Sequence, residues 1–281
     1  MATLQTRTLG FIAASLILGL VRPAVAVTPA VTIAPTETDA GKIMAAVENR
    51  ATGDRGTARM QMTITDGAGR SRSRVVQSRT MKFAGGTKQL MIFESPADVR
   101  NTALLSVDYD DGAKDDDQWL YLPSLRKSTR ISSSDKSGAF MGSDLTYADM
   151  TKKDAKHYTY TLVKPEVTVG DEVCWLIESR PKTAKEQRET GYLKSLLWVS
   201  KAKLLPVQSK AWVREGKKLK YVKFGRIKQV AGIWIPHRIS VRTVRGKQVV
   251  STTVLEFLRY KLNDPAVTAA DFTQRRLEKG L

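Results

Sequence analysis

Residues 58–65 read Ala-Arg-Met-Gln-Met-Thr-Ile-Thr, an unbroken alternation of apolar and polar side chains. Because successive side chains of a strand point to opposite faces of a sheet, this period of two predicts a strand with one buried face. Asp66-Gly67-Ala68-Gly69 follows as a turn, and residues 70–83 and 88–93 continue as strands. This part of the chain therefore predicts a meander of antiparallel strands.

Strand-like segments continue almost to the end of the chain. They lie at 102–109, 118–122, 156–163, 172–179, 193–200, 206–213, 219–227, 234–244 and 248–260. Many of them are longer than the ~5–6 residues usual for a strand. Long strands favour a curved sheet, and long curved sheets tend to enclose an interior space. The pattern predicts a mainly β protein with one large, curved antiparallel sheet, closed or half-closed.

A short helix is expected before the first strand. Asp39 can cap a helix with its apolar side chains on one side, which we expect to end near Gly53. Helical periodicity returns weakly at 143–153 and 269–277. Because a short helix needs a surface to pack on, we expect one to three helices to cover the concave face of the sheet.

The beginning of the chain resembles an export signal. An apolar run at 9–21 precedes the small-x-small pattern Ala24-Val25-Ala26, which predicts a signal peptide over residues 1–26. The run has 13 residues, fewer than the ~20 that span a bilayer, although an uncleaved anchor stays open as an alternative. Residues 27–38 are predicted to be a flexible segment and residues 39–281 a single domain. Export from the cytoplasm makes nucleic acid an unexpected partner.

Positive charge is concentrated in the second part of the chain. The formal net charge is +18; residues 27–181 hold 21 basic and 21 acidic side chains, whereas residues 182–281 hold 23 and 7. Basic side chains can keep strand edges soluble. They can equally attract an anionic membrane surface or an acidic partner, and the sequence leaves both interpretations open.

The composition argues against catalytic and metal chemistry. The one cysteine excludes an internal disulfide, and His157 and His237 lack a neighbouring nucleophile motif or metal-ligand spacing. No Gly-x-Ser-x-Gly elbow or phosphate-binding glycine loop is present. We therefore expect no enzyme, no cofactor and no metal site, and a calcium-dependent hydrolase would need a triad that the sequence lacks.

One acidic stretch, residues 108–117, holds six aspartates and so has the oxygen ligands that calcium prefers. Its spacing departs from that of an EF-hand loop. A solvated turn between two strands is the simpler interpretation, and the sequence does not decide whether calcium binds there.

Two motifs resemble a known family. Residues 118–131 read Gln-Trp-Leu-Tyr-Leu-Pro-Ser-Leu-Arg-Lys-Ser-Thr-Arg-Ile, and residues 140–150 read Phe-Met-Gly-Ser-Asp-Leu-Thr-Tyr-Ala-Asp-Met. Together they resemble the signature of the periplasmic outer-membrane lipoprotein-sorting proteins, distant relatives of the LolA-type lipoprotein carrier. The resemblance implies a half-barrel of the LolA and LppX kind, whose helices and loops cover an apolar cavity for lipid chains. It also implies a periplasmic location and an association with an RND (resistance-nodulation-division) or MMPL-type transporter.

A carrier needs a concave apolar face under a removable cover, since burying acyl chains recovers ~25 cal/mol per Å² of apolar surface. We expect residues 132–138 to act as a mobile flap, and the inner face to be left unfilled by the protein's own side chains, with room for an acyl chain. The alternative is that Phe140 and Tyr147 only anchor this loop to the sheet. The candidate residues of cavity and lid are Met60, Met62, Met81, Trp119, Tyr121, Phe140, Met141, Leu145, Tyr147, Trp198 and Trp212.

Two functional hypotheses follow from these observations. The first is a periplasmic carrier that shuttles a lipid or lipidated protein between membranes, with acyl chains and an RND or MMPL-type transporter as its partners. The second is a periplasmic adaptor without transport activity, docked on a membrane transporter through its basic face.

Overall fold

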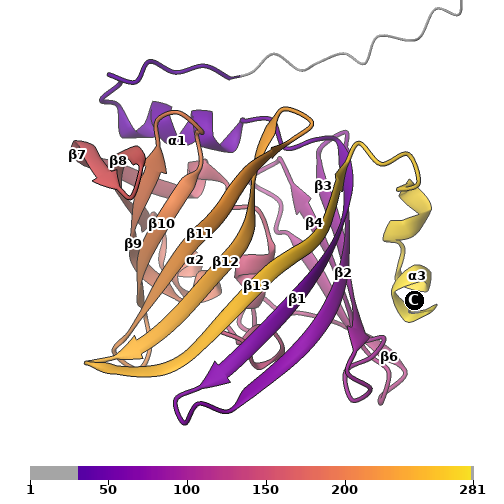
Figure 1. The fold of residues 1–281 in the computed structure, drawn as a ribbon. Helices are drawn as coiled ribbons and strands as arrows, with labels where there is room; N and C mark the ends of the chain where they lie inside the picture. The colour runs from indigo at the N-terminus through magenta and orange to yellow at the C-terminus, as the bar shows by residue number, and fades with distance from the viewer. Residues whose placement is uncertain (1–30, 280–281) are drawn as a thin grey trace, which may run out of the picture.

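The alternating segments form thirteen strands, which pair into one antiparallel sheet in the computed structural model of residues 31–279 (Figure 1). The predicted signal peptide, residues 1–26, and residues 27–30 lie outside the described residues. The strands are β1 (Arg55–Asp66), β2 (Ser71–Phe83), β3 (Gly86–Ser95), β4 (Ala103–Tyr109), β5 (Asp117–Leu122), β6 (Lys127–Arg130), β7 (Tyr158–Val169), β8 (Glu172–Pro181), β9 (Tyr192–Ser200), β10 (Pro206–Val213), β11 (Lys218–Val230), β12 (Ile233–Arg245) and β13 (Gln248–Leu262). The helices are α1 (Ala40–Glu48), α2 (Ala184–Thr190) and α3 (Gln274–Lys279), with 3-10 helices η1 (Phe140–Gly142), η2 (Tyr147–Met150), η3 (Ala155–His157) and η4 (Ala269–Phe272).

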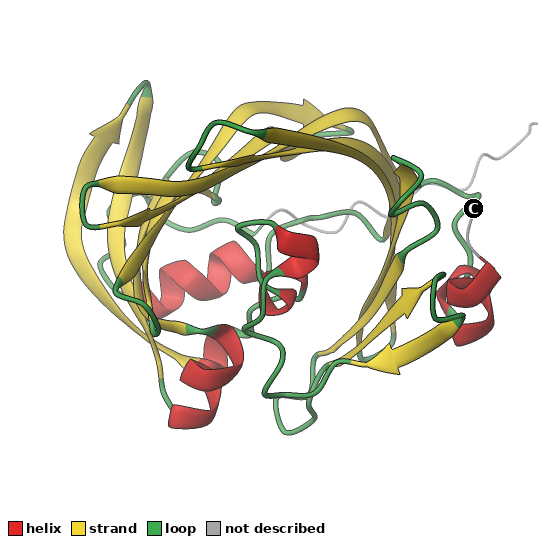
Figure 2. Cartoon of the chain, turned by 90° about the horizontal axis from the view of Figure 1, so that it is seen from below, coloured by secondary structure: helices red, strands yellow, loops and turns green. Residues whose placement is uncertain are grey.

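The strand order places the first and last strands at the centre of the sheet. It runs β6-β5-β4-β3-β2-β1-β13-β12-β11-β10-β9-β8-β7, so that β1 pairs with β13 and the edges are β6 and β7. The sheet curls into an open trough, with α1 inside the curve and α3 outside it (Figure 2). The predicted mainly β half-barrel is confirmed. Because β6 and β7 are consecutive in the chain, residues 131–157 cross the open side of the trough.

The pairing register shows which side chains face the inside of the trough. Met62 pairs with Leu255 and Leu255 with Ile239, and directly paired residues share a face, which we call the inner face. The register carries this face across β11, β10 and β9 to Ile177 of β8. There α1 packs on it, with Ile43 fully buried in the cluster that contains Ile177.

Helix α1 begins where the sequence predicts. The Asp39 carboxylate accepts hydrogen bonds from the backbone N–H groups of Gly41 (2.8 Å) and Lys42 (3.0 Å), which satisfies two donors that the first turn leaves free. The helix ends at Glu48, earlier than the predicted end near Gly53. Among residues 31–279, no helix combines the length and apolar character needed to cross a bilayer.

The C-terminal segment covers part of the outer face. Val267, Phe272 and Leu277 pack on Leu90 and Ile92 of β3, whose strand neighbours Met91 and Phe93 belong to the inner cluster. Since adjacent strand residues point to opposite faces, η4 and α3 lie on the outer side. The C-terminal segment therefore does not cover the inner face, on which α1 and the segment that crosses the open side pack.

We expect Ile43→Ala to lower the free energy of unfolding by about 2–4 kcal/mol, because it leaves a cavity between α1 and β8. Lys42→Ala, at the exposed neighbouring position, changes it by about 0.5 kcal/mol or less. Urea unfolding followed by tryptophan fluorescence measures both. If both substitutions lowered the free energy of unfolding equally, the packing of α1 on the sheet would be contradicted.

Candidate functional site

The inner face of β11 and β12 is apolar and incompletely covered. Phe224 pairs with Ile239, and Val222 pairs with Val241 on the same face. Val222, Phe224 and Ile239 are half-buried, in contrast to the buried Leu255 beside them. These side chains, which we call the inner wall, therefore keep apolar surface that neither α1 nor the crossing segment covers.

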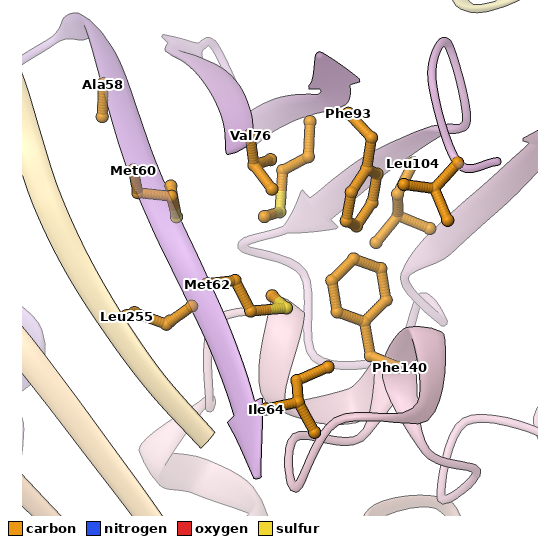
Figure 3. Close-up of a cluster of buried hydrophobic side chains, with 11 residues drawn as sticks. Ala58, Met60, Met62, Ile64, Val76, Phe93, Leu104, Phe140 and Leu255 are labelled. Atoms are coloured by element: carbon orange, nitrogen blue, oxygen red, sulfur yellow. The ribbon is translucent and has the colours of Figure 1, made fainter. Parts of the chain in front are cut away.

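The crossing segment fills the inner side near β1 to β4. We call residues 136–150 the covering loop, and its Phe140 is 0% exposed. The Phe140 ring lies 5.9 Å from that of Phe93 and 5.6 Å from that of Tyr147, measured between ring centroids. Figure 3 shows Phe140 facing Phe93, with Met62 and Ile64 beside it. The expectation of an unfilled inner face needs correction here, because the protein's own loop occupies this part.

A buried carboxylate holds the covering loop to the sheet. Asp144 is only 5% exposed, and its carboxylate accepts hydrogen bonds from the hydroxyls of Thr253 (2.7 Å), Thr243 and Ser251. Its backbone N–H also donates to the Thr253 hydroxyl at 2.9 Å. Neutral hydroxyls make weaker partners for a carboxylate than a lysine or arginine does, so these contacts position the loop without a buried ion pair.

Further polar contacts hold the middle and the C-terminal end of the loop. The Tyr192 hydroxyl donates to the Asp149 carboxylate at 2.7 Å, and Lys220 Nζ donates to the Tyr192 oxygen at 3.0 Å. Burial raises the pKa of Tyr192 and lowers the pKa of Lys220. The Arg74 guanidinium donates to the Met141 carbonyl. The covering loop is thus attached mainly by side chains, with one isolated backbone bridge inside it, between Ala139 and Thr146.

Six of the predicted site residues lie together in one cluster on the inner face. The cluster joins the thioethers of β1 to the apolar side chains of the covering loop. Its predicted members are Met60, Met62, Phe140, Met141, Leu145 and Tyr147.

The other five predicted residues lie elsewhere. Met81, Trp119 and Tyr121 pack on the outer face, under the C-terminal segment. Trp198 follows Leu197 of the inner face, so its side chain points outward, where it packs with Cys174. The Trp212 ring also faces outward, with Lys194 Nζ 4.6 Å and Lys210 Nζ 4.7 Å from its centroid.

A polar cavity of about 740 Å³ lies between the acidic stretch and α2. Its walls come from the C-terminal end of α1, from residues 108–116, from residues 151–158 and from α2, and Lys136 and Ala148 of the covering loop also line it. No sequence pattern predicts this cavity, because its walls come from segments far apart in the chain.

Asp108 is buried in a wall of this cavity rather than in a solvated turn. The residue is 8% exposed, and within residues 31–279 no donor forms a hydrogen bond with its Oδ1 atom. Burial, together with the nearby Asp116 carboxylate, raises the pKa of Asp108 to about 8. The simpler interpretation of the acidic stretch was wrong for this residue, since nothing in its sequence context distinguishes it from its exposed neighbours.

Other carboxylates of the acidic stretch pair with lysines. Asp115 lies 2.6 Å from Lys185 Nζ and Asp110 lies 3.9 Å from Lys152 Nζ. In the part of the chain that the structure describes, no group of three or more His, Cys, Asp or Glu side chains is arranged to hold a metal ion.

Comparison with known proteins identifies a matching family and solved structures with a similar fold. A family model whose description reads "Uncharacterized protein" matches residues 85–279, more than half of the chain. A crystal structure from Vibrio parahaemolyticus, provisionally described as an outer membrane lipoprotein-sorting protein domain, is 28% identical with a TM-score of 0.76, covering 85% of this chain and 98% of that chain. A DUF1329 family protein from Desulfovibrio piger also gives 28% identity and a TM-score of 0.76, covering 85% and 97%. A LolA superfamily protein from Nitrosomonas europaea shares the fold at 20% identity and a TM-score of 0.63, covering 85% and 99%. No curated protein sequence gives a significant match.

We expect Asp108→Asn to stabilise the protein increasingly as the pH rises from 5 to 8. In this range the folded wild type retains a proton on Asp108 that the unfolded chain has released, so the wild type loses stability as the pH rises. The difference grows by roughly 1 kcal/mol per pH unit, the linkage expected for one proton. Urea unfolding at pH 5 and pH 8 measures it, with the exposed Asp110→Asn as the control of equal charge. A stability difference that does not change with pH would contradict the buried, proton-binding Asp108.

Proposed function

Since the chain belongs to the family matched over residues 85–279, and its solved neighbours include lipoprotein-sorting and LolA superfamily proteins, we propose that it is a carrier for a lipid or a lipidated protein. The observation that carries the proposal is the half-buried apolar inner wall beside a loop held by side-chain contacts. In this proposal the chain works in the periplasm after loss of residues 1–26, beside an RND or MMPL-type transporter. The proposal contains no catalytic step.

Acyl chains would bind along the inner wall and displace the covering loop. Moving the loop exposes Phe140, whose burial contributes about 1.5–3 kcal/mol. A chain of a dozen methylenes recovers about 0.8 kcal/mol for each buried methylene, so it outweighs that loss several times over. Opening also uncovers Met60 and Met62, whose flexible thioethers fit ligands of varied shape.

The second candidate, an adaptor without transport activity, is favoured by the basic outer face of β10 to β12. Lys210, Tyr221 and Arg242 pair in register on this face. Lys210 Nζ lies 5.7 Å and the Arg242 guanidinium carbon 5.6 Å from the centroid of the Tyr221 ring. Basic and aromatic side chains together suit the surface of an anionic membrane or of a protein embedded in it.

Two adjacent substitutions in β11 separate the two functions. Val222→Glu places a charge on the inner wall, and we expect it to weaken uptake of a fluorescent fatty-acid analogue at least tenfold, roughly 1.4 kcal/mol. Lys223→Glu, on the exposed outer face, keeps lipid uptake but weakens retention on anionic vesicles at low salt. Thermal melts confirm that both variants are folded. Normal lipid uptake by Val222→Glu would contradict the carrier proposal, and unchanged vesicle retention by Lys223→Glu would contradict an outer docking face.

We expect Asp144→Ala to loosen the covering loop. The substitution removes the acceptor for three hydroxyls. Amide hydrogen exchange in residues 136–150 and the rate of lipid uptake should both rise at least about tenfold, because the loss of even one charge-assisted hydrogen bond has an effect of this size. Exchange monitored by mass spectrometry and stopped-flow fluorescence measure the two effects. Asp135→Ala, exposed in the same segment, is the control. Faster exchange without faster uptake would show that the loop does not gate the site.

A further inference from the structure

The polar cavity contains carboxyl oxygens that lack donors. Asp108 Oδ1 and Glu189 Oε1 are both buried, and neither has a hydrogen-bond partner within residues 31–279. A buried acceptor without a donor costs about 1–3 kcal/mol, so such atoms are rare unless a ligand or water completes them. Both residues line the cavity of about 740 Å³, a volume within the range of small-molecule sites.

Three of the lysines that line the cavity are engaged with other carboxylates, whereas within the described residues Lys114, Lys153, Lys156 and Lys182 line it without an ion pair. Lys152 Nζ lies 3.1 Å from Glu48, Lys185 Nζ lies 2.6 Å from Asp115, and Lys136 Nζ lies 3.8 Å from Oε2 of Glu189. By contrast, within the described residues no basic side chain lies within 4.0 Å of the Asp108 or Asp116 carboxylates, the limit for an ion pair. Within these residues, the Asp108 carboxylate therefore lacks a positively charged hydrogen-bond donor.

The raised pKa of Asp108 is consistent with the missing donor. Burial and the nearby Asp116 carboxylate raise the pKa of Asp108 to about 8, and the more distant charges of Lys152 and Lys136 offset this only in part. Among the residues that the structure describes, the Asp116 carboxylate accepts one hydrogen bond, from the backbone N–H of Tyr109 at 2.9 Å. A cation that carries N–H donors would satisfy the free oxygen and offset the repulsion between the two acids.

We propose that the polar cavity binds a primary ammonium group, and that this group is the head of an aminophospholipid. A primary ammonium offers three N–H donors and a full charge, whereas a trimethylated ammonium offers the charge without a donor for Asp108 Oδ1. The proposal rests on the proposed carrier function and names the class of its cargo.

The covering loop links this cavity to the inner wall. Lys136 and Ala148 of the loop line the cavity, while Phe140 and Tyr147 of the same loop pack on the inner face. Because one loop borders both surfaces, an amphiphile whose acyl chain lies on the inner wall would place its head group near the cavity. The two surfaces match the two ends of a lipid.

The test compares lysophosphatidylethanolamine with lysophosphatidylcholine of the same acyl chain, by calorimetry on the full chain without its leader. The wild type is expected to bind the ethanolamine lipid roughly tenfold more tightly, as for one charge-assisted hydrogen bond. Asp108→Asn should reduce the preference to less than about twofold, and Asp110→Asn, an exposed acid at the cavity rim, should keep it. Thermal melts confirm that both variants are folded.

The outcomes separate this inference from the carrier function. Equal binding of the two lipids by the wild type overturns the ammonium site and leaves the carrier in place, as does a preference that survives in Asp108→Asn. If neither lipid binds, the carrier proposal fails, and free ethanolamine and choline decide on the site by NMR titration. Shifts in residues 108–116 with ethanolamine but not choline uphold an amine site, and their absence overturns it.

Discussion

The connection between the two edge strands is the constraint on which the rest of the structure depends. Strands β6 and β7 are neighbours in the chain but lie at opposite edges of a thirteen-stranded sheet. The residues between them cross the open side of the trough. The topology thus brings this segment over the opening, and its own side chains, Phe140 and Asp144 among them, hold it to the inner face.

The cover combines an apolar contact with a polar one of moderate strength. Phe140 is packed as completely as any core side chain, whereas Asp144 is held by hydroxyl groups instead of a cation. Removing Phe140 from the inner face is a loss that an acyl chain can replace, because both are apolar. The hydroxyls of Thr243 and Thr253 can turn to water or to each other once Asp144 leaves. Both contacts therefore suit a segment that closes and opens repeatedly.

Hydrophobic periodicity predicted most strands of the sheet. It failed for elements that are too short to show a period. Twelve of the thirteen strands and the cap at Asp39 follow from alternation and capping rules, but β6 has four residues and α2 seven, too few for a period to emerge. Alternation also shows which residues share a face without showing which face is inside. Met81, Trp119 and Tyr121 were therefore assigned to the cavity although the C-terminal segment covers them on the outside. Asp108 and Asp144 were missed as special residues because burial of a single carboxylate is a tertiary property.

The pairing of β1 with β13 has a consequence for how the chain reaches its final form. Every other ladder joins strands that are neighbours in sequence, so two local meanders, β1 to β6 and β7 to β13, can form early and independently. The ladder between β1 and β13 needs residues from both ends of the chain. The entropic cost of bringing these two strands together is therefore offset only after synthesis is complete. Until then β1 and the unfinished second meander present unpaired edges, which is the state in which a nascent chain most needs a chaperone.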